Sequence, residues 1–98
     1  MAGLRWTEES AQWLQDIFEY ISVDNPDAAE KVISTIFEKA QVLIEHPELG
    51  HKYQTFSGRQ VRILIYGHYR ITYLIKESGD IDILGVFHGS LDIDRYLV

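Results

Sequence analysis

Arginine and histidine side chains in the second half of the chain are the residues best suited to chemistry. Arg62 and Arg70 each interrupt a run of apolar residues typical of a strand, and His88 ends a third such run. An arginine in that setting faces solvent, pairs with a carboxylate or binds an anion. A strand end projects its side chain from a rigid scaffold. Together the three side chains could therefore form a patch that binds an anion or stabilises a phosphate.

A plainer interpretation accounts for the same residues. The two arginines could lie on an exposed sheet face with Asp82 as their partner, and His88 could hydrogen-bond the chain as it leaves the sheet. Ser90 stands between His88 and Asp92, but residues this close in sequence rarely reach the geometry of a catalytic triad. The sequence around Ser90 also lacks the nucleophile elbow of serine hydrolases. We therefore expect no serine-based catalytic site.

The turn at Gly67-His68 decides which residues share a face of the sheet. A shift of one residue in strand pairing turns every side chain to the opposite face. A two-residue turn puts Arg62 opposite Tyr73 and on the face away from Arg70. A three-residue loop puts both arginines on the same face. The sequence leaves both registers open.

The remaining histidines give no sign of a metal site. His46 falls at a helix end, His51 in a loop and His68 in a turn, and no His-x-x-x-His pair occurs. The chain also has no cysteine, which excludes a disulfide framework, a thiolate nucleophile and a Cys-ligated zinc site. We expect neither a metal ion nor a cofactor.

Length and charge narrow the class of protein. With 98 residues, 46% of them hydrophobic, the chain suits one domain spanning residues 1–98 with a modest core. Its 15 acidic side chains outnumber nine basic ones, for a net charge of −6. Proteins that bind nucleic acid by their surface field concentrate Lys and Arg, so direct nucleic-acid binding is not expected. No run approaches the roughly 18 apolar residues of a membrane helix, and no signal-peptide pattern is seen, so we expect a cytoplasmic protein with no membrane contact.

Two consecutive amphipathic helices are predicted for the first half of the chain. Thr7 is placed as the N-cap of a helix that stops near Val23, and Asn25-Pro26 favours a second start. The second helix is predicted to run to His46, because Pro47 disfavours helical geometry in the residue before it. Apolar residues recur at helical spacing along both helices: Ala11, Trp13, Leu14, Ile17, Phe18, Tyr20 and Ile21 in the first, and Ala29, Val32, Ile33, Ile36, Phe37, Ala40, Leu43 and Ile44 in the second.

The second half of the chain predicts an antiparallel meander. Three runs rich in β-branched and aromatic residues are separated by Gly67-His68 and by residues 77–80, and connections this short allow only hairpins. Gly85, within the last run, suggests a bulge or a close backbone approach. The three predicted strands cover residues 61–65, 69–76 and 81–88.

The fold class follows from these elements. Residues 4–6 could form a short first strand, residues 51–58 are interpreted as a loop, and residues 91–98 as a short C-terminal helix or tail. The apolar stripe of the helical pair needs a covering layer, which the meander supplies. We therefore predict an α+β domain in which an N-terminal α-helical hairpin packs on a small antiparallel sheet.

Five short sequence motifs follow one another along the chain, and their order points to a protein family. Trp6 precedes the first helix, and Asn25-Pro26-Asp27-Ala28-Ala29 opens the second. His46-Pro47-Glu48-Leu49-Gly50 follows the second helix. Tyr69-Arg70-Ile71-x-Tyr73 and then the run Ile83 to Gly89 close the meander. In this order, and over nearly the whole chain, the motifs resemble the RelE/ParE superfamily of toxins, particularly its ParE-like branch.

The resemblance implies the toxin of a bacterial type II toxin–antitoxin pair, also known as a plasmid stabilisation system. ParE-like members act on DNA gyrase by binding and are not regarded as enzymes, whereas RelE-like members cleave mRNA on the ribosome. In both branches a cognate antitoxin lays a flexible, partly helical segment over the toxin. We therefore expect a ParE-like toxin that binds gyrase and a cognate antitoxin, with a toxin–antitoxin heterotetramer as the expected assembly.

The end of the last predicted strand departs from the family pattern. A His-x-Arg-x-Asp element is expected there, and the chain has His88-Gly89-Ser90-Leu91-Asp92, with serine in place of arginine. A RelE-like endoribonuclease acting through Arg62, Arg70, His88 and Tyr96 is the alternative, and a family member without toxicity is another. Enzymatic activity is thus left open, with a preference for none. The candidate residues for contact with the target or the antitoxin are Arg62, Arg70, His88, Ser90, Asp92 and Arg95.

Overall fold

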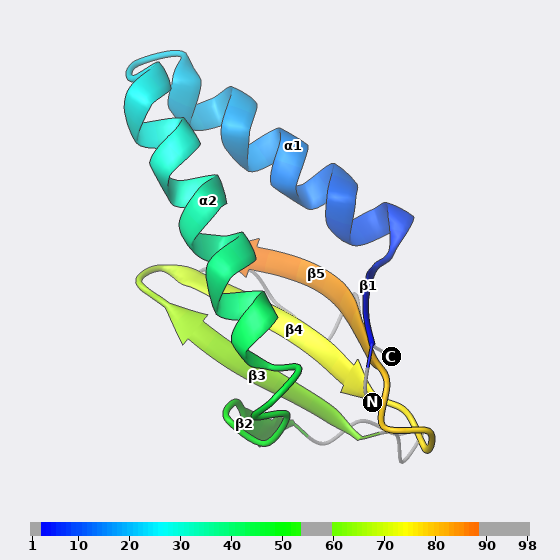
Figure 1. Ribbon diagram of the computed structural model, residues 1–98. Coiled ribbons are helices and arrows are strands. Elements are labelled where there is room, and N and C mark those ends of the chain that lie inside the picture. Colours follow the sequence, from blue (N-terminus) through cyan, green and yellow to red (C-terminus); the bar gives the residue numbers. More distant parts are fainter. Residues whose placement is uncertain (1–2, 54–59, 89–98) are drawn as a thin grey trace.

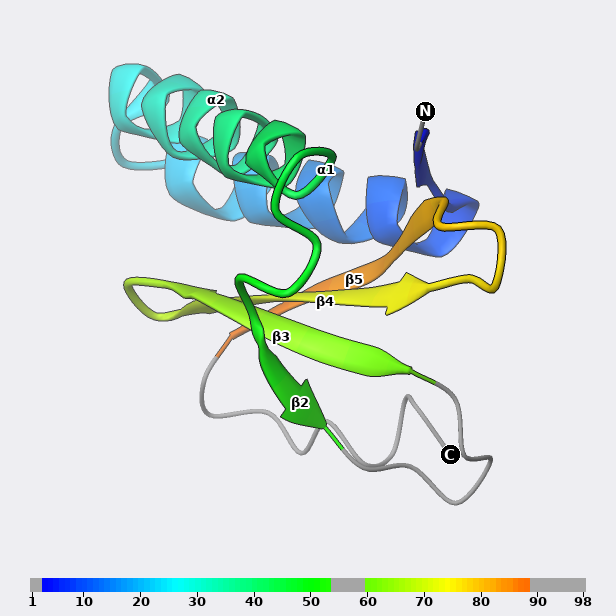
Figure 2. The ribbon, with the colours of Figure 1, turned by 60° about the horizontal axis from the view of Figure 1, so that its bottom comes forward.

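A helical hairpin and a twisted sheet form the two layers of the protein. The computed structural model describes residues 3–53 and 60–88. Both helices lie over one face of the sheet (Figures 1 and 2), as the predicted α+β class requires. Within the described residues the sheet has five strands in the order β1-β5-β4-β3-β2. The elements are β1 (Leu4–Trp6), α1 (Glu8–Ser22), α2 (Pro26–Val42), β2 (His51–Tyr53), β3 (Val61–Tyr66), β4 (Tyr69–Ile75) and β5 (Ile81–His88).

Side-chain caps fix where both helices begin. The Thr7 hydroxyl accepts a hydrogen bond from the Ser10 N–H (3.1 Å) and donates one to the carbonyl oxygen of Ile83 (2.8 Å), which ties the start of α1 to β5. The Asn25 side chain accepts from the Ala28 N–H (3.1 Å) at the start of α2. Such caps satisfy backbone N–H groups that have no partner within the helix. The predicted helix starts are confirmed.

The end of α2 comes earlier than predicted. The regular helix stops at Val42 and not at His46, because the next turns tighten: the Leu43 N–H bonds to the carbonyl of Ala40 (3.0 Å) and the Glu45 N–H to that of Val42 (3.2 Å). Bonds over three residues are typical of the last turn of a helix. The chain therefore reaches Pro47 through tight turns, and the four-residue difference carries it down toward the sheet.

The meander adopts the two-residue register. Tyr66 pairs with Tyr69 across Gly67-His68, and Arg62 pairs with Tyr73. Gly67 has a φ of +57°, a left-handed conformation that glycine adopts without a steric penalty. Of the two alternatives that the sequence left open, the structure therefore has Arg62 and Arg70 on opposite faces of the sheet.

Two short strands extend the meander at its edges. β1 pairs in parallel with β5, with Leu4 opposite Ile81 and Trp6 opposite Ile83, so the sheet is mixed rather than purely antiparallel. β2 pairs antiparallel with β3. Its residues had been interpreted as part of a loop, and that interpretation is wrong for His51–Tyr53. His51, Lys52 and Tyr53 include no aliphatic or β-branched residue, so no apolar alternation indicates a strand there.

The core lies between the helices and the sheet. Its fully enclosed side chains come from both helices and from β4 and β5, and burying each large aliphatic one stabilises the fold by about 1.5–3 kcal/mol. Phe37 and Phe18, predicted on the buried stripes, are instead 43% and 40% exposed, and Tyr20 is 83% exposed. The buried cluster consists of Leu14, Ile36, Ala40, Leu43, Ile71, Tyr73, Ile81, Ile83 and Val86.

Part of the sheet face turned away from the helices is also buried, although Ile65 on that face is 51% exposed. Val61, Ile63, Thr72 and Phe87 are each at most 3% exposed, and strand alternation places them on that side. The bulge expected at Gly85 is confirmed, whereas the group that lies close to this glycine is a side chain and not backbone. The pairing shifts by one residue beside it, and a Cβ at Gly85 would lie 2.6 Å from the Phe87 ring.

Candidate functional site

Arg62 is used to hold the segment that joins α2 to the sheet. Its Nη1 donates to the carbonyl oxygen of Gly50 (2.6 Å) and to that of Glu48 (3.2 Å). A charged donor makes stronger hydrogen bonds than a neutral one. The guanidinium therefore anchors the backbone of residues 47–50, hereafter the junction. Nothing in the sequence pattern signals these carbonyl partners, because they lie twelve and fourteen residues upstream.

Tyr73 holds the same junction from the neighbouring strand. Its hydroxyl donates to the carbonyl oxygen of Pro47 (2.7 Å) and accepts from the Gly50 N–H (2.9 Å). Burial raises the pKa of Tyr73 above its usual 10.0, against the lowering effects of the Gly50 N–H and of Arg62. The phenol therefore stays protonated and keeps both bonds at physiological pH.

Gly50 permits this close arrangement. A Cβ on Gly50 would lie 2.8 Å from the carbonyl oxygen of Ile63 and 2.8 Å from the Tyr73 hydroxyl, closer than real Cβ contacts come. The Pro47 to Gly50 motif noted in the sequence thus has a structural explanation. Its proline supplies a carbonyl to Tyr73, and its glycine allows the backbone to lie directly on β3 and β4.

The candidate charged residues do not converge on one point. Arg62 and His88 share the helix-facing side of the sheet, but their partners on β4, Tyr73 and Tyr69, are four residues apart. Four strand residues span about 13 Å. Arg70 pairs with Ile65 and Phe87 on the opposite face. The three side chains predicted as a possible anion site are therefore separated among the described residues.

His88 belongs to a cluster of rings where the β3–β4 hairpin meets the end of β5, hereafter the hairpin end. The rings of His68 and His88 stack with centroids 5.8 Å apart, and Tyr69 meets His88 edge-on at 6.0 Å. Tyr66 lies 6.4 Å from Tyr69, and Lys39 Nζ lies 5.5 Å from the centre of the Tyr66 ring. Burial raises the pKa of Tyr69, with smaller raising effects from Tyr66 of β3 and Tyr20 of α1. Rings and a nearby cation suit contact with a partner surface.

Asp82 does not pair with Arg62 or Arg70, and the prediction of that partnership is wrong. Its carboxylate binds Arg5 Nη2 (3.1 Å) and Lys76 Nζ (3.2 Å). The reason is the unexpected parallel pairing, which sets Arg5 of β1 directly opposite Asp82. Asp82 therefore links the first strand to the sheet and has no part in a site near the arginines.

The other predicted residues fall outside the structural description. Ser90, Asp92, Arg95 and Tyr96 lie beyond residue 88, as does the proposed C-terminal helix or tail of residues 91–98. Within residues 3–53 and 60–88, no group of three or more histidine, aspartate or glutamate side chains is arranged to hold a metal ion. In the same part of the chain, no helix is long and apolar enough to cross a membrane.

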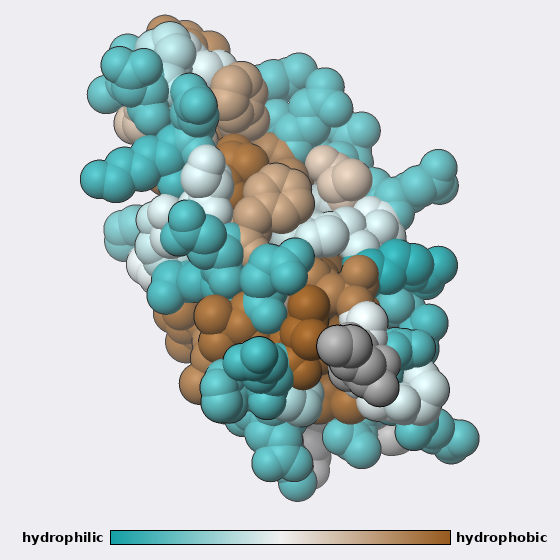
Figure 3. Space-filling model, viewed as in Figure 1, coloured by the Kyte–Doolittle hydropathy of each residue, from teal (hydrophilic) through white to brown (hydrophobic). Residues whose placement is uncertain are grey.

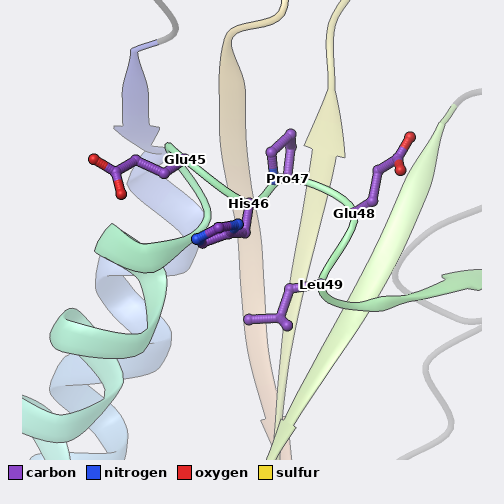
Figure 4. A pocket seen from close by; sticks show the side chains of 5 residues that line it. All are labelled: Glu45, His46, Pro47, Glu48 and Leu49. Carbon is purple, nitrogen blue, oxygen red and sulfur yellow. The ribbon is translucent and has the colours of Figure 1, made fainter.

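Large apolar side chains reach the surface on the helical layer and the junction. Leu49 is 55% exposed, and Val42 and Phe37 are also exposed. Figure 3 shows apolar side chains among hydrophilic ones where α2 ends above the sheet. A hollow lined by Glu45, His46, Pro47, Glu48 and Leu49 lies beside them (Figure 4). These side chains leave apolar area exposed to solvent on α2 and on the junction.

Comparison with known proteins gives a consistent set of relatives. Residues 4–93 match the family described as the ParE toxin of the type II toxin–antitoxin system parDE. A Sinorhizobium fredii protein named "Putative toxin Y4kP" is 36% identical over 85 residues, which is 87% of this chain and 85% of that protein.

Two solved structures share the fold. One is described as a chromosomal ParDE system from P. aeruginosa, with a TM-score of 0.74 and 24% identity over 90% of this chain and 96% of that one. The other is described as the toxin–antitoxin complex RelBE2 from Mycobacterium tuberculosis, with a TM-score of 0.68 and 20% identity over 89% of this chain and 96% of that one. At these identities the likeness concerns the fold.

Proposed function

Because this chain belongs to the ParE family of toxins of type II toxin–antitoxin systems, we propose that it acts by binding a protein target rather than by catalysis. DNA gyrase is the target that the ParE-like resemblance implies. We further propose that a cognate antitoxin neutralises the toxin in the cytoplasm, in a heterotetramer of toxin and antitoxin.

The separation of the charged candidates is the observation that carries this proposal. Stabilising the charge of a cleaved phosphate needs donors aimed at one place. Here Arg62 is bonded to two carbonyl oxygens of the junction, and Arg70 lies on the opposite face. The described chain thus supports binding better than phosphate chemistry. We propose Arg70 and His88, with the rings of the hairpin end, as target contacts, together with Ser90, Asp92 and Arg95 beyond the described residues.

An antitoxin partner is supported by the surface and by the relatives. The structural neighbours carry descriptions of toxin–antitoxin systems. Phe37, Val42 and Leu49 leave apolar area uncovered on the helical layer and junction, and an amphipathic segment laid in such a place would cover it. The helical hairpin and the junction are therefore the proposed seat of the antitoxin.

Inducible expression of this chain alone, without an antitoxin, tests the target. The expected result is growth arrest with intact mRNA and with a DNA-damage response, and inhibition of supercoiling when purified toxin is added to purified gyrase. Coexpression of the antitoxin should restore growth. Normal supercoiling by gyrase at saturating toxin would contradict the proposal.

A RelE-like ribonuclease is the second candidate, and the likeness to a fold described as RelBE2 favours keeping it. It predicts rapid mRNA cleavage on ribosomes after induction, abolished by substitution of His88. Absence of any growth effect would instead favour a family member that retains the fold without toxicity.

A further inference from the structure

The outer surface at the end of α2 combines exposed apolar and acidic side chains. It runs from the last turns of α2 into the junction, and every member is exposed to solvent. The hollow beside Leu49 gives this surface a concave part (Figure 4). The members of this α2–β2 surface are Glu38, Val42, Glu45, Glu48 and Leu49.

Negative charge is concentrated on the half of the chain that forms this surface. Between residues 8 and 48 the sequence has ten carboxylates and two lysines, whereas the remaining residues have five carboxylates and seven basic side chains. The helical layer is therefore strongly acidic although the rest of the chain is slightly basic. A field of this sign attracts a cationic partner and repels an anionic one.

The helix geometry strengthens the negative field at this end. The last carbonyl groups of a helix carry a partial negative charge, so cations stabilise this end and carboxylates oppose it. Glu45 and Glu48 nevertheless follow the end of α2. Two nearby cations are already engaged: Lys39 lies over the Tyr66 ring, and Arg62 binds junction carbonyls. The carboxylates of Glu45 and Glu48 therefore still attract a further cation.

The junction presents Leu49 in a fixed position. Tyr73 holds the carbonyl of Pro47 and the N–H of Gly50, and the Leu49 N–H bonds to the carbonyl of His46 (3.1 Å). An exposed apolar side chain on a backbone held at both ends loses little further freedom when a partner covers it. The hydrogen bonds therefore prepare the surface for binding.

We propose that the α2–β2 surface binds the cognate antitoxin through an amphipathic segment of net positive charge, which sets an apolar side chain on Leu49 and separate lysine or arginine side chains beside Glu45 and beside Glu48, whose carboxylates point to opposite sides of Pro47 (Figure 4). This inference depends on the proposed function, because it specifies the chemistry of the antitoxin segment. Contact of an acidic segment here would place like charges together, which is costly in a desolvated interface.

Calorimetric titration with the purified cognate antitoxin tests the inference. The wild-type complex should weaken as NaCl rises from about 50 to about 500 mM, because salt screens attraction between opposite charges. Leu49→Ala should weaken binding about tenfold through lost apolar contact. Glu48→Lys should weaken it about fivefold at low salt and less at high salt, and Glu45→Lys/Glu48→Lys more strongly.

Glu77→Lys is the matched control, because Glu77 is exposed in the β4–β5 turn outside the acidic half of the chain. It makes the same change of charge and should leave antitoxin affinity within about twofold of the wild type. Circular dichroism and the thermal midpoint establish that each variant is folded before its affinity is compared.

The outcomes separate this inference from the function on which it depends. If the wild-type toxin fails to bind the antitoxin, the proposed partnership itself is overturned. If it binds, but binding strengthens with salt or does not respond to it, the segment is not basic and the inference fails alone. Equal affinities of the wild type, Leu49→Ala and the charge-reversed variants would move the antitoxin to another surface.

Discussion

The junction and the hairpin end stand on the same face of one sheet and use polar residues in opposite ways. At the junction, the Arg62 guanidinium and the Tyr73 hydroxyl are both bonded to backbone of residues 47–50. At the hairpin end, His68 and Tyr66 meet their neighbours ring against ring. A charged or phenolic side chain within a strand can thus hold backbone as readily as it binds a ligand. Substitutions should therefore cost stability at the junction and little at the hairpin end.

Gly50→Ala should cause the largest loss. The added Cβ would collide with the carbonyl of Ile63 and the Tyr73 hydroxyl, both held by other bonds, so the backbone must move. We expect the free energy of unfolding to fall by about 3 kcal/mol, measured by urea denaturation. Gly3→Ala is the control, because its Cβ would meet Asp80 only at an ordinary 3.5 Å. An equal fall in the free energy of unfolding for Gly50→Ala and Gly3→Ala would contradict this prediction.

Tyr73→Phe should lower the free energy of unfolding by about 2 kcal/mol. It keeps the ring but leaves the Gly50 N–H and the Pro47 carbonyl without the hydroxyl that joins them. Tyr66→Phe removes a hydroxyl at the hairpin end and should change stability by less than about 0.5 kcal/mol. Similar values for the two variants would show that the junction is less constrained than its geometry indicates.

The raised pKa of Tyr73 predicts an alkaline effect. A folded-state pKa above the usual 10.0 means that the contribution to stability is fully present below about pH 10 and is lost as the pH rises through the folded value. Above pH 10 the wild type should lose stability more steeply than Tyr73→Phe, by up to about 1.4 kcal/mol per pH unit. Parallel denaturation series from pH 8 to pH 11 measure the difference, and coincident slopes would contradict the assignment.

Substitutions of Arg62 and Arg70 should have smaller effects on stability, and the two can be compared directly. Arg62→Gln should cost about 1 kcal/mol through lost bonds to the junction carbonyls. Arg70→Gln, on the opposite face, should cost less than about 0.5 kcal/mol. Thermal unfolding of both variants measures the contrast, and a larger loss at Arg70 would reverse our assignment of roles.

His68→Ala should have the smallest effect. The residue is exposed at the second turn position and contacts His88 by ring stacking, so the free energy of unfolding should stay within about 0.5 kcal/mol of the wild type. Chemical denaturation checks this. A loss above about 1 kcal/mol would show that the hairpin end also supports the fold.

Local rules predicted the parts of the fold that depend on neighbours in sequence. The caps at Thr7 and Asn25 and the hairpin at Gly67-His68 are set by residues within a few positions, and each is where the sequence placed it. The burial of Phe37 was mispredicted, because its position lies at the margin of the apolar stripe of α2. The apolar stripe of a helix does not show which of the residues at its edge the sheet will cover.

Partners distant in the chain could not be predicted in the same way. The salt bridge from Arg5 to Asp82 and the hydrogen bonds from Arg62 to the junction depend on which strands become neighbours and in which register. Alternation gives the face of each strand but not its neighbour. The candidate site was accordingly predicted by residue type, whereas the geometry that separates Arg62, Arg70 and His88 came only with the structure.

The pairing of β1 with β5 has a consequence for the order of events during synthesis. Residues 4–6 can pair within the sheet only after residues 81–83 have been synthesised. Closing so long a loop is a slow, late step in folding. When only the helices and β3 have left the ribosome, β4 and β5 are not yet present for the helices to pack against. The five-strand sheet can therefore be completed only after β5 has been synthesised, and until then the apolar stripes of the two helices lack strands that bury them.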